Sequence, residues 1–117
     1  MRIGEIRFFT NMDKRCKPNL HFLKFLVLNN RNDMRLSMLQ LASPEQLRCV
    51  LEVIANVLYG NIRIPPETLR KLKKHKQFLV KLWRGRDSLK RKRVTLKENY
   101  KIIRKVLDSA KPFFSSL

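Results

Sequence analysis

The segment SPEQLRCVLEVIANVLYG, residues 43–60, constrains the fold more than any other part of the chain. Ser43 and Gln46 have the spacing of a capping box, and Pro44 suits a first helical turn. Gly60 is a typical helix stop. The apolar side chains between these signals cover more than half of a helical wheel. A helix with so wide an apolar face is usually surrounded by other helices, so we expect this one to be the core.

Two shorter helices are predicted before this segment. The stretch LHFLKFLVL begins at Leu20 and ends near Asn29. The next pattern begins with a cap at Asn32 or Asp33 and ends at Leu41. Apolar residues in both recur at three- and four-residue spacing, which places them on one helix face.

Two longer and more basic helices are predicted after the segment. One is expected over residues 66–84 and ends before Gly85. The other is expected over residues 95–111, with Thr95 and Glu98 as a second capping box. The residues between them are expected to form a basic turn.

These patterns predict an all-α fold, a small helical bundle of about five helices. We expect residues 1–18 to form a loosely ordered N-terminal arm. Residues 19–111 would form the bundle, with a basic C-terminal half, and residues 112–117 a tail.

Positive charge is the dominant feature of the composition. The chain has 27 Lys and Arg against 9 Asp and Glu, a formal net charge of +18. Residues 63–105 hold seventeen basic and three acidic side chains, which leaves +14 in that segment. Such a surface attracts polyanions, so nucleic acid is the first partner to consider, with an anionic membrane or an acidic protein next. The alternative is a basic helix face that is simply solvated.

The basic segment supplies the candidate nucleic-acid-binding residues. Each is expected to bind phosphate and none to read bases, which implies low sequence specificity and favours duplex DNA. The sequence LKRKR at 89–93 also resembles a nuclear import signal. The candidates are Arg70, Lys71, Lys73, Lys74, Lys81, Arg84, Arg86, Lys90, Arg91, Lys92, Arg93, Lys97, Lys101, Arg104 and Lys105.

Two aromatic residues of the predicted helix over residues 66–84 lie within this basic segment. Phe78 falls among the lysines on the helical wheel, where it would pack against another helix, the last one, or stack on an unpaired base. Trp83 falls on the apolar stripe and is expected in the core.

Residue patterns for catalysis or metal binding are lacking. His21 and His75 are isolated from carboxylates and cysteines, and no glycine-rich phosphate loop occurs. We therefore expect no enzyme, no catalytic residues, no metal and no cofactor. Cys16 and Cys49 form no recognisable disulfide framework or zinc motif. The lack of a cysteine framework suits a reducing compartment. We also find no signal peptide and no membrane span in the sequence, so we expect a soluble, intracellular protein.

Four sequence features follow one another in a distinctive order. They are NVL-x-GN, a proline-containing helix start, KLKKHK and SLKRKR. This order resembles a family of short basic proteins encoded by Polinton/Maverick-type mobile elements and the related adintoviruses. The resemblance covers about two thirds of the chain, from Leu20 to Leu96, and departs from the family's pattern afterwards. It implies a small virion or DNA-associated protein in the nucleus or the virion.

The expected function is therefore that of a DNA-packaging or virion core protein that binds nucleic acid electrostatically. The alternative is a structural or adaptor protein that docks on capsid or another acidic protein. Association with a membrane surface is a further alternative, although the apolar stripes are already assigned to the core.

Overall fold

A computed structural model describes residues 16–117, and this part of the chain contains eight α-helices and no strand. The all-α class is confirmed, but the expected number of about five helices is wrong. Residues 1–15 of the predicted arm lie outside the described part. The helices are α2 (Leu20–Leu28), α3 (Asn32–Leu41), α4 (Pro44–Leu58), α5 (Pro66–Lys73), α6 (Lys76–Arg84), α7 (Leu89–Glu98), α8 (Tyr100–Ser109) and α9 (Lys111–Ser115).

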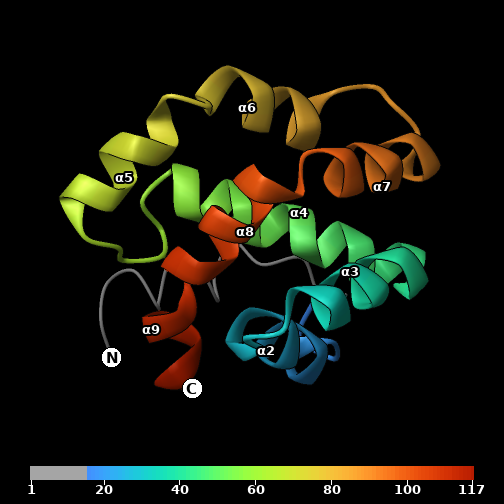
Figure 1. Cartoon of the computed structure of the whole chain (residues 1–117), viewed down its shortest axis with the longest axis horizontal. Helices are drawn as coiled ribbons and strands as arrows, with labels where there is room; N and C mark the ends of the chain where they lie inside the picture. Colours follow the sequence, from blue (N-terminus) through green and yellow to red (C-terminus); the bar gives the residue numbers. More distant parts are fainter. Residues whose placement is uncertain (1–15) are drawn as a thin grey trace.

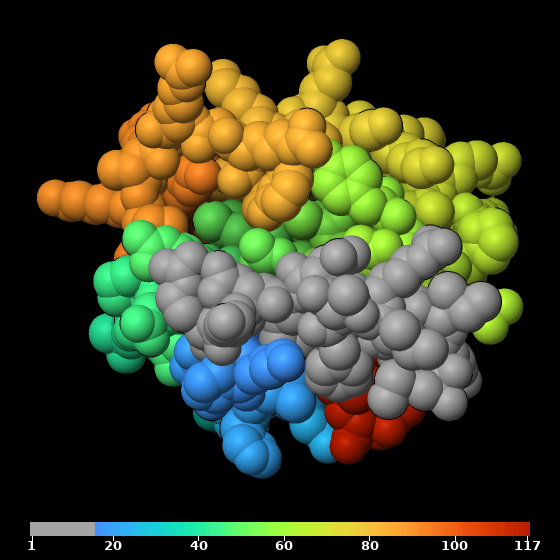
Figure 2. Space-filling view, turned by 180° about the vertical axis from the view of Figure 1, so that it is seen from behind, coloured from blue at the N-terminus to red at the C-terminus, as the bar shows by residue number. Residues whose placement is uncertain are grey.

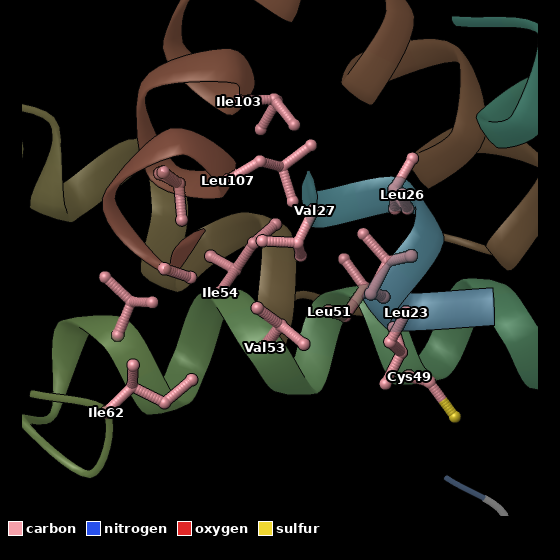
Figure 3. Close-up of a cluster of buried hydrophobic side chains, with 14 of the residues drawn as sticks. Leu23, Leu26, Val27, Cys49, Leu51, Val53, Ile54, Ile62, Ile103 and Leu107 are labelled. Carbon is pink, nitrogen blue, oxygen red and sulfur yellow. The ribbon is translucent and has the colours of Figure 1, made fainter. Parts of the chain in front are cut away.

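Helix α4 is the centre of the molecule, as its wide apolar face predicts. It packs against α2, α5, α6, α7 and α8 (Figure 1). Ten of its fifteen residues are buried. Figure 3 shows side chains from α2, α4 and α8 meeting in one hydrophobic cluster, among them Leu26, Ile54 and Leu107.

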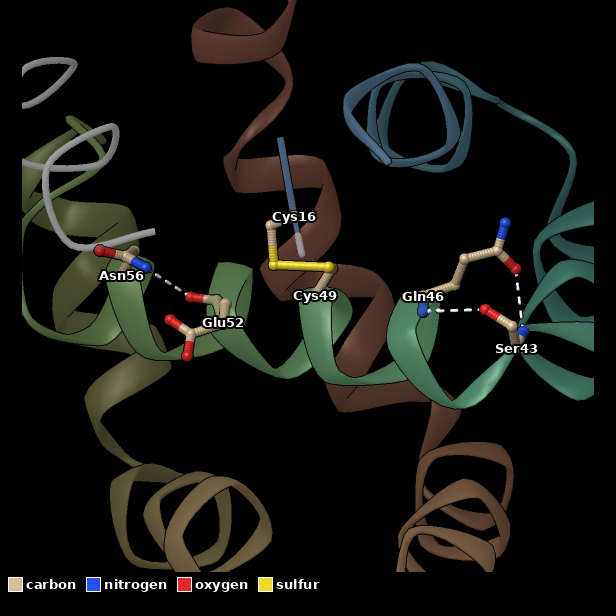
Figure 4. Close-up of a disulfide and its surroundings, with 6 residues drawn as sticks. All are labelled: Cys16, Ser43, Gln46, Cys49, Glu52 and Asn56. Atoms are coloured by element: carbon tan, nitrogen blue, oxygen red, sulfur yellow. Dashed lines mark hydrogen bonds between the residues drawn. A yellow bond between two sulfur atoms is a disulfide. The ribbon is translucent and has the colours of Figure 1, made fainter. Parts of the chain in front are cut away.

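Both ends of α4 form as the sequence predicts. The hydroxyl of Ser43 accepts a 3.1 Å hydrogen bond from the N–H of Gln46, whose side chain accepts one of 2.9 Å from the N–H of Ser43 (Figure 4). At the other end Gly60 has a φ of +75°, a left-handed conformation that glycine adopts at low cost. The side-chain oxygen of Asn56 accepts a 2.9 Å hydrogen bond from the side chain of Asn61, which fixes the turn.

The predicted helix over residues 66–84 is divided into α5 and α6. The break lies at Lys74 and His75, where the N–H of His75 bonds to the carbonyl of Leu72 as a turn. Neither residue is a helix breaker, so no local signal marks the division. It lets α6 pack along α4 while α5 also reaches α8.

The predicted capping box at Thr95 is also wrong. Helix α7 begins six residues earlier, at Leu89, and the hydroxyl of Ser88 caps it by accepting a 3.1 Å bond from the N–H of Arg91. Thr95 lies inside α7 and donates to the carbonyl of Arg91. The helix ends at Asn99, whose side-chain amide bonds to the carbonyl of Thr95. The basic turn expected over residues 85–94 is therefore mostly helical.

Two smaller predictions at helix ends also fail. Helix α3 begins at Asn32 and makes no side-chain cap, so neither Asn32 nor Asp33 caps it. Pro112 lies in the first turn of α9 rather than ending a helix. Phe113 and Phe114, expected in a tail, are 3% and 0% exposed, and α9 packs against α2 (Figure 1).

Cys16 and Cys49 form a disulfide, contrary to the expectation of two reduced thiols (Figure 4). Their Cα atoms are 5.3 Å apart, and both residues are fully buried. The bond ties the first described residue to the central helix. A separation of 33 residues carries no pairing signal, so only the folded arrangement identifies the partners.

Arg35 is the most deeply buried charged side chain in residues 16–117, with 1% exposure. Its guanidinium donates to the carbonyls of Leu26 and Val27, at the end of α2, and to the carboxylate of Asp108 on α8. Arg35 therefore caps α2 and links three helices. Burial raises the pKa of the neighbouring Tyr100, which lies close to this ion pair.

Candidate nucleic-acid interface

The predicted phosphate-binding residues lie on four adjoining helices, apart from Lys74 in the turn after α5 and Arg86 in the connection after α6. Helix α8 contacts both α5 and α7, and α6 follows α5 along the upper side of the molecule (Figure 1). In Figure 2, long side chains of the α5–α6 and α6–α7 regions project into solvent along the upper rim. Thirteen of the fifteen predicted residues are exposed; they are Arg70, Lys71, Lys73, Lys74, Lys81, Arg84, Arg86, Lys90, Arg91, Lys97, Lys101, Arg104 and Lys105. We call these thirteen the basic surface.

The cations of the basic surface are almost free of carboxylate partners. Within residues 16–117, Arg70 alone among them forms an ion pair, with Glu67 at 3.9 Å, and both side chains are more than 70% exposed. An exposed pair of this kind is weak. The field of the other twelve therefore stays positive and directed at solvent.

Lys92 points inward, although the sequence places it within KRKR. It is 8% exposed, and its ammonium donates a 3.2 Å hydrogen bond to the carbonyl of Trp83 at the end of α6. A cation at this position interacts favourably with the negative, C-terminal end of the α6 helix dipole. Lys92 thus contributes to the contact between α6 and α7.

Arg93 also bonds within the protein. Its guanidinium donates to the carbonyls of Leu39 and Gln40, at distances of 2.8 and 3.0 Å. These carbonyls lie at the end of α3, so Arg93 caps that helix from α7. Lys90 and Arg91 face solvent, so KRKR consists of an outward pair and an inward pair.

Two clefts bring cations of different helices together. One, of about 420 Å³, lies between α5 and α8 and is lined by Lys71 and Lys105 together with apolar side chains such as Leu72. The other, of about 210 Å³, lies between α6 and α7 and is lined by Lys81 and Arg91 together with Asp87. The basic residues of neighbouring helices are thus brought together by the fold rather than by the sequence alone.

Phe78 packs partly against the core and lines the cleft between α6 and α7. Packing against the last helix was one of its two predicted roles. The residues of the neighbouring helix that line the cleft, Arg91 and Thr95, lie on α7 instead. Part of the residue remains accessible. Stacking on an unpaired base stays a prediction.

Sequence reasoning missed Tyr59, an exposed aromatic residue beside the basic surface. Tyr59 meets Trp83 edge to face, with ring centroids 5.7 Å apart. Trp83 is partly exposed and packs against the core instead of lying within it. No pattern in the sequence could have joined two residues 24 positions apart on separate helices.

In residues 16–117 no helix is long and apolar enough to cross a membrane. The same residues contain no cluster of three or more His, Cys, Asp or Glu side chains suited to a metal ion.

No protein-family model, curated protein or solved structure matches this chain.

Proposed function

We propose that this protein is a non-enzymatic, electrostatic nucleic-acid-binding protein with low sequence specificity. The observation that carries the proposal is the basic surface, thirteen exposed cations of which one has a carboxylate partner among the described residues. Duplex DNA is the proposed partner because it offers a regular array of phosphates to cations fixed on helices.

The resemblance to proteins of mobile elements and adintoviruses supports the biological setting that we propose. In that setting the protein packages DNA or belongs to a virion core, in the nucleus or in the particle. Binding that depends on phosphate alone suits packaging, since a packaged genome must be covered irrespective of its sequence.

The decisive experiment measures duplex DNA affinity across a series of salt concentrations for two matched variants. Lys90→Gln with Arg91→Gln removes the outward pair, and Lys92→Gln with Arg93→Gln removes the inward pair. Both change the net charge by the same amount within one tetrapeptide.

The outward variant should bind more weakly and reduce the slope of log affinity against log salt by about 2, at about 0.9 per phosphate contact. Its melting temperature should not change. The inward variant should melt at a lower temperature, because two helix ends lose their caps. An outward variant with unchanged affinity and slope would contradict the proposal.

One observation favours the alternative function as an adaptor for an acidic protein. The cleft between α5 and α8 combines apolar residues, Leu72 and Pro112, with two lysines, Lys71 and Lys105. Asp108 also lines it, but its carboxylate is already paired with Arg35 and Lys111. A peptide with one apolar side chain between carboxylates would fit this combination. The adaptor function predicts saturable binding to acidic peptides and only weak DNA retention at physiological ionic strength.

A further inference from the structure

Arg84 lies against two aromatic rings at the edge of the basic surface. Its guanidinium carbon is 5.1 Å from the centroid of Trp83 and 5.7 Å from that of Tyr59. Both distances fall within the range of a cation–π contact. The cation is therefore held by two rings from two different helices.

The ends of two packed helices fix this arrangement. Tyr59 is the C-cap of α4, and its N–H bonds to the carbonyl of Ala55 at 3.0 Å. Trp83 and Arg84 are the last two residues of α6, which packs along α4. At Gly85 the chain leaves the helix, and a Cβ there would clash with the carbonyl oxygen of Lys81. The position of the guanidinium thus follows from backbone that has little freedom.

The rings hold Arg84 without using its hydrogen-bond donors. Arg84 is exposed, and its guanidinium makes no hydrogen bond or ion pair to any residue in the described part. An arginine has five N–H donors in a planar fork that matches two oxygens of a phosphate. Because no residue of the described part accepts from these donors, they remain available to a ligand, and the two ring contacts reduce the side-chain entropy lost on binding.

We propose that Tyr59 and Trp83 are positioning residues that preorganise Arg84 as a bidentate anchor for a phosphodiester group. This inference rests on the proposed function and adds a specific contact to it. The other exposed cations act through charge, whereas Arg84 acts through charge and shape. The partner chemistry is a phosphate oxygen pair, and the phosphate of a nucleic acid backbone is its source.

Trp83 provides the first test because it is the single tryptophan of the chain. A duplex of about one helical turn should change the emission of Trp83 with the same midpoint as a gel-shift titration. Polyglutamate of equal charge should bind more weakly and change the emission less at the same concentration, because its flexible chain does not present the regular phosphate array of a duplex, although a carboxylate can also accept from the fork. Duplex binding with no change in emission would overturn the inference. Emission that responds to phosphatidylserine vesicles but not to duplex would reassign the anchor to lipid and also overturn it.

A double-mutant cycle provides the second test. Arg84→Lys keeps the charge but loses the fork, and Tyr59→Leu removes one ring. Each should lower duplex affinity by about two- to fivefold, the equivalent of one exposed cation–π contact. The duplex affinity of the double variant should equal that of the single variant with the lower affinity, because both changes remove the same contact.

The control cycle combines Tyr59→Leu with Lys81→Gln, a cation on α6 that touches neither ring, and its effects should add. Tyr59→Phe retains the ring and should bind as tightly as the wild type, while circular dichroism shows which variants stay folded. If the wild-type protein retains no duplex, the proposed function itself fails. If it retains duplex while the Arg84 and Tyr59 effects are absent or additive, only the inference fails.

Discussion

The guanidinium of Arg35 donates a 2.8 Å hydrogen bond to the carboxylate of Asp108, a residue 73 positions further along the chain. The arginine is almost fully buried, whereas the carboxylate is 43% exposed and also meets the ammonium of Lys111 at 3.3 Å. The pair therefore connects the core to solvent. Arg35 stabilises the fold mainly through its hydrogen bonds to the buried carbonyls of Leu26 and Val27.

Replacing Arg35 should destabilise the protein strongly. In Arg35→Met the carbonyls of Leu26 and Val27 lose their charged donor, which should cost about 2–4 kcal/mol of unfolding free energy. The measurement is urea unfolding followed by circular dichroism. Arg31→Gln is the matched control, since Arg31 pairs with Asp33 in full contact with solvent. Equal midpoints for the two variants would contradict the assigned role of Arg35.

The disulfide should contribute a large share of the stability. Closing a loop of 33 residues between Cys16 and Cys49 stabilises by about 3–4 kcal/mol in the chain-entropy view. The variant Cys16→Ala with Cys49→Ala should therefore melt at a clearly lower temperature than the oxidised protein. A thiol reagent under denaturing conditions should find no free cysteine in the oxidised protein, and one reactive thiol per cysteine would contradict the pairing.

Two glycine substitutions should act through different causes. Gly60→Ala meets no atom within 4 Å, so its cost is that of the left-handed conformation, about 1–2 kcal/mol. Gly85→Ala forces a Cβ onto backbone at the end of α6, which should cost about 1–3 kcal/mol and move Arg84. Thermal melting measures both costs. Gly85→Ala should also change the emission of Trp83, because it moves Arg84 against that ring, and an unchanged spectrum would contradict the described geometry.

Alkaline pH should destabilise the protein through Tyr100. Burial raises the pKa of its hydroxyl, which donates a 2.8 Å hydrogen bond to Asn32. The neutral form is favoured in the folded state, so the stabilisation is complete below the unfolded pKa. It is lost as pH rises through the folded pKa. Absorbance at alkaline pH should show one tyrosine that ionises late, and Tyr100→Phe should abolish that transition. Retention of the late transition in Tyr100→Phe would contradict this assignment.

Sequence reasoning succeeded where the signals are local. The capping box of Ser43, the stop at Gly60 and the wide apolar face of α4 all depend on residues within one helix, and all are confirmed. It failed at Thr95, because Ser88 offers an equally good cap and begins the helix earlier. It also failed at His75, where packing of α6 on α4 breaks a helix that its own residues would continue.

The candidate interface shows the same limit. Exposure of most cations follows from helix periodicity, and the thirteen exposed residues agree with the prediction that the basic helices face solvent. The inward direction of Lys92 and Arg93 depends on helix ends elsewhere in the chain, which periodicity does not encode. The same is true of Tyr59, whose neighbour Arg84 is brought to it only by the packing of α4 against α6.

The packing of α9 on α2 has a consequence for synthesis. A nascent chain completes α2 at Leu28, but the residues that cover it, Phe113 and Phe114, emerge some 85 positions later. At ribosomal rates of 5–20 residues per second, that delay is roughly 4–17 s. Throughout this interval the apolar side of α2 lacks its final cover, so completion of the native state must wait until Phe113 and Phe114 have been synthesised.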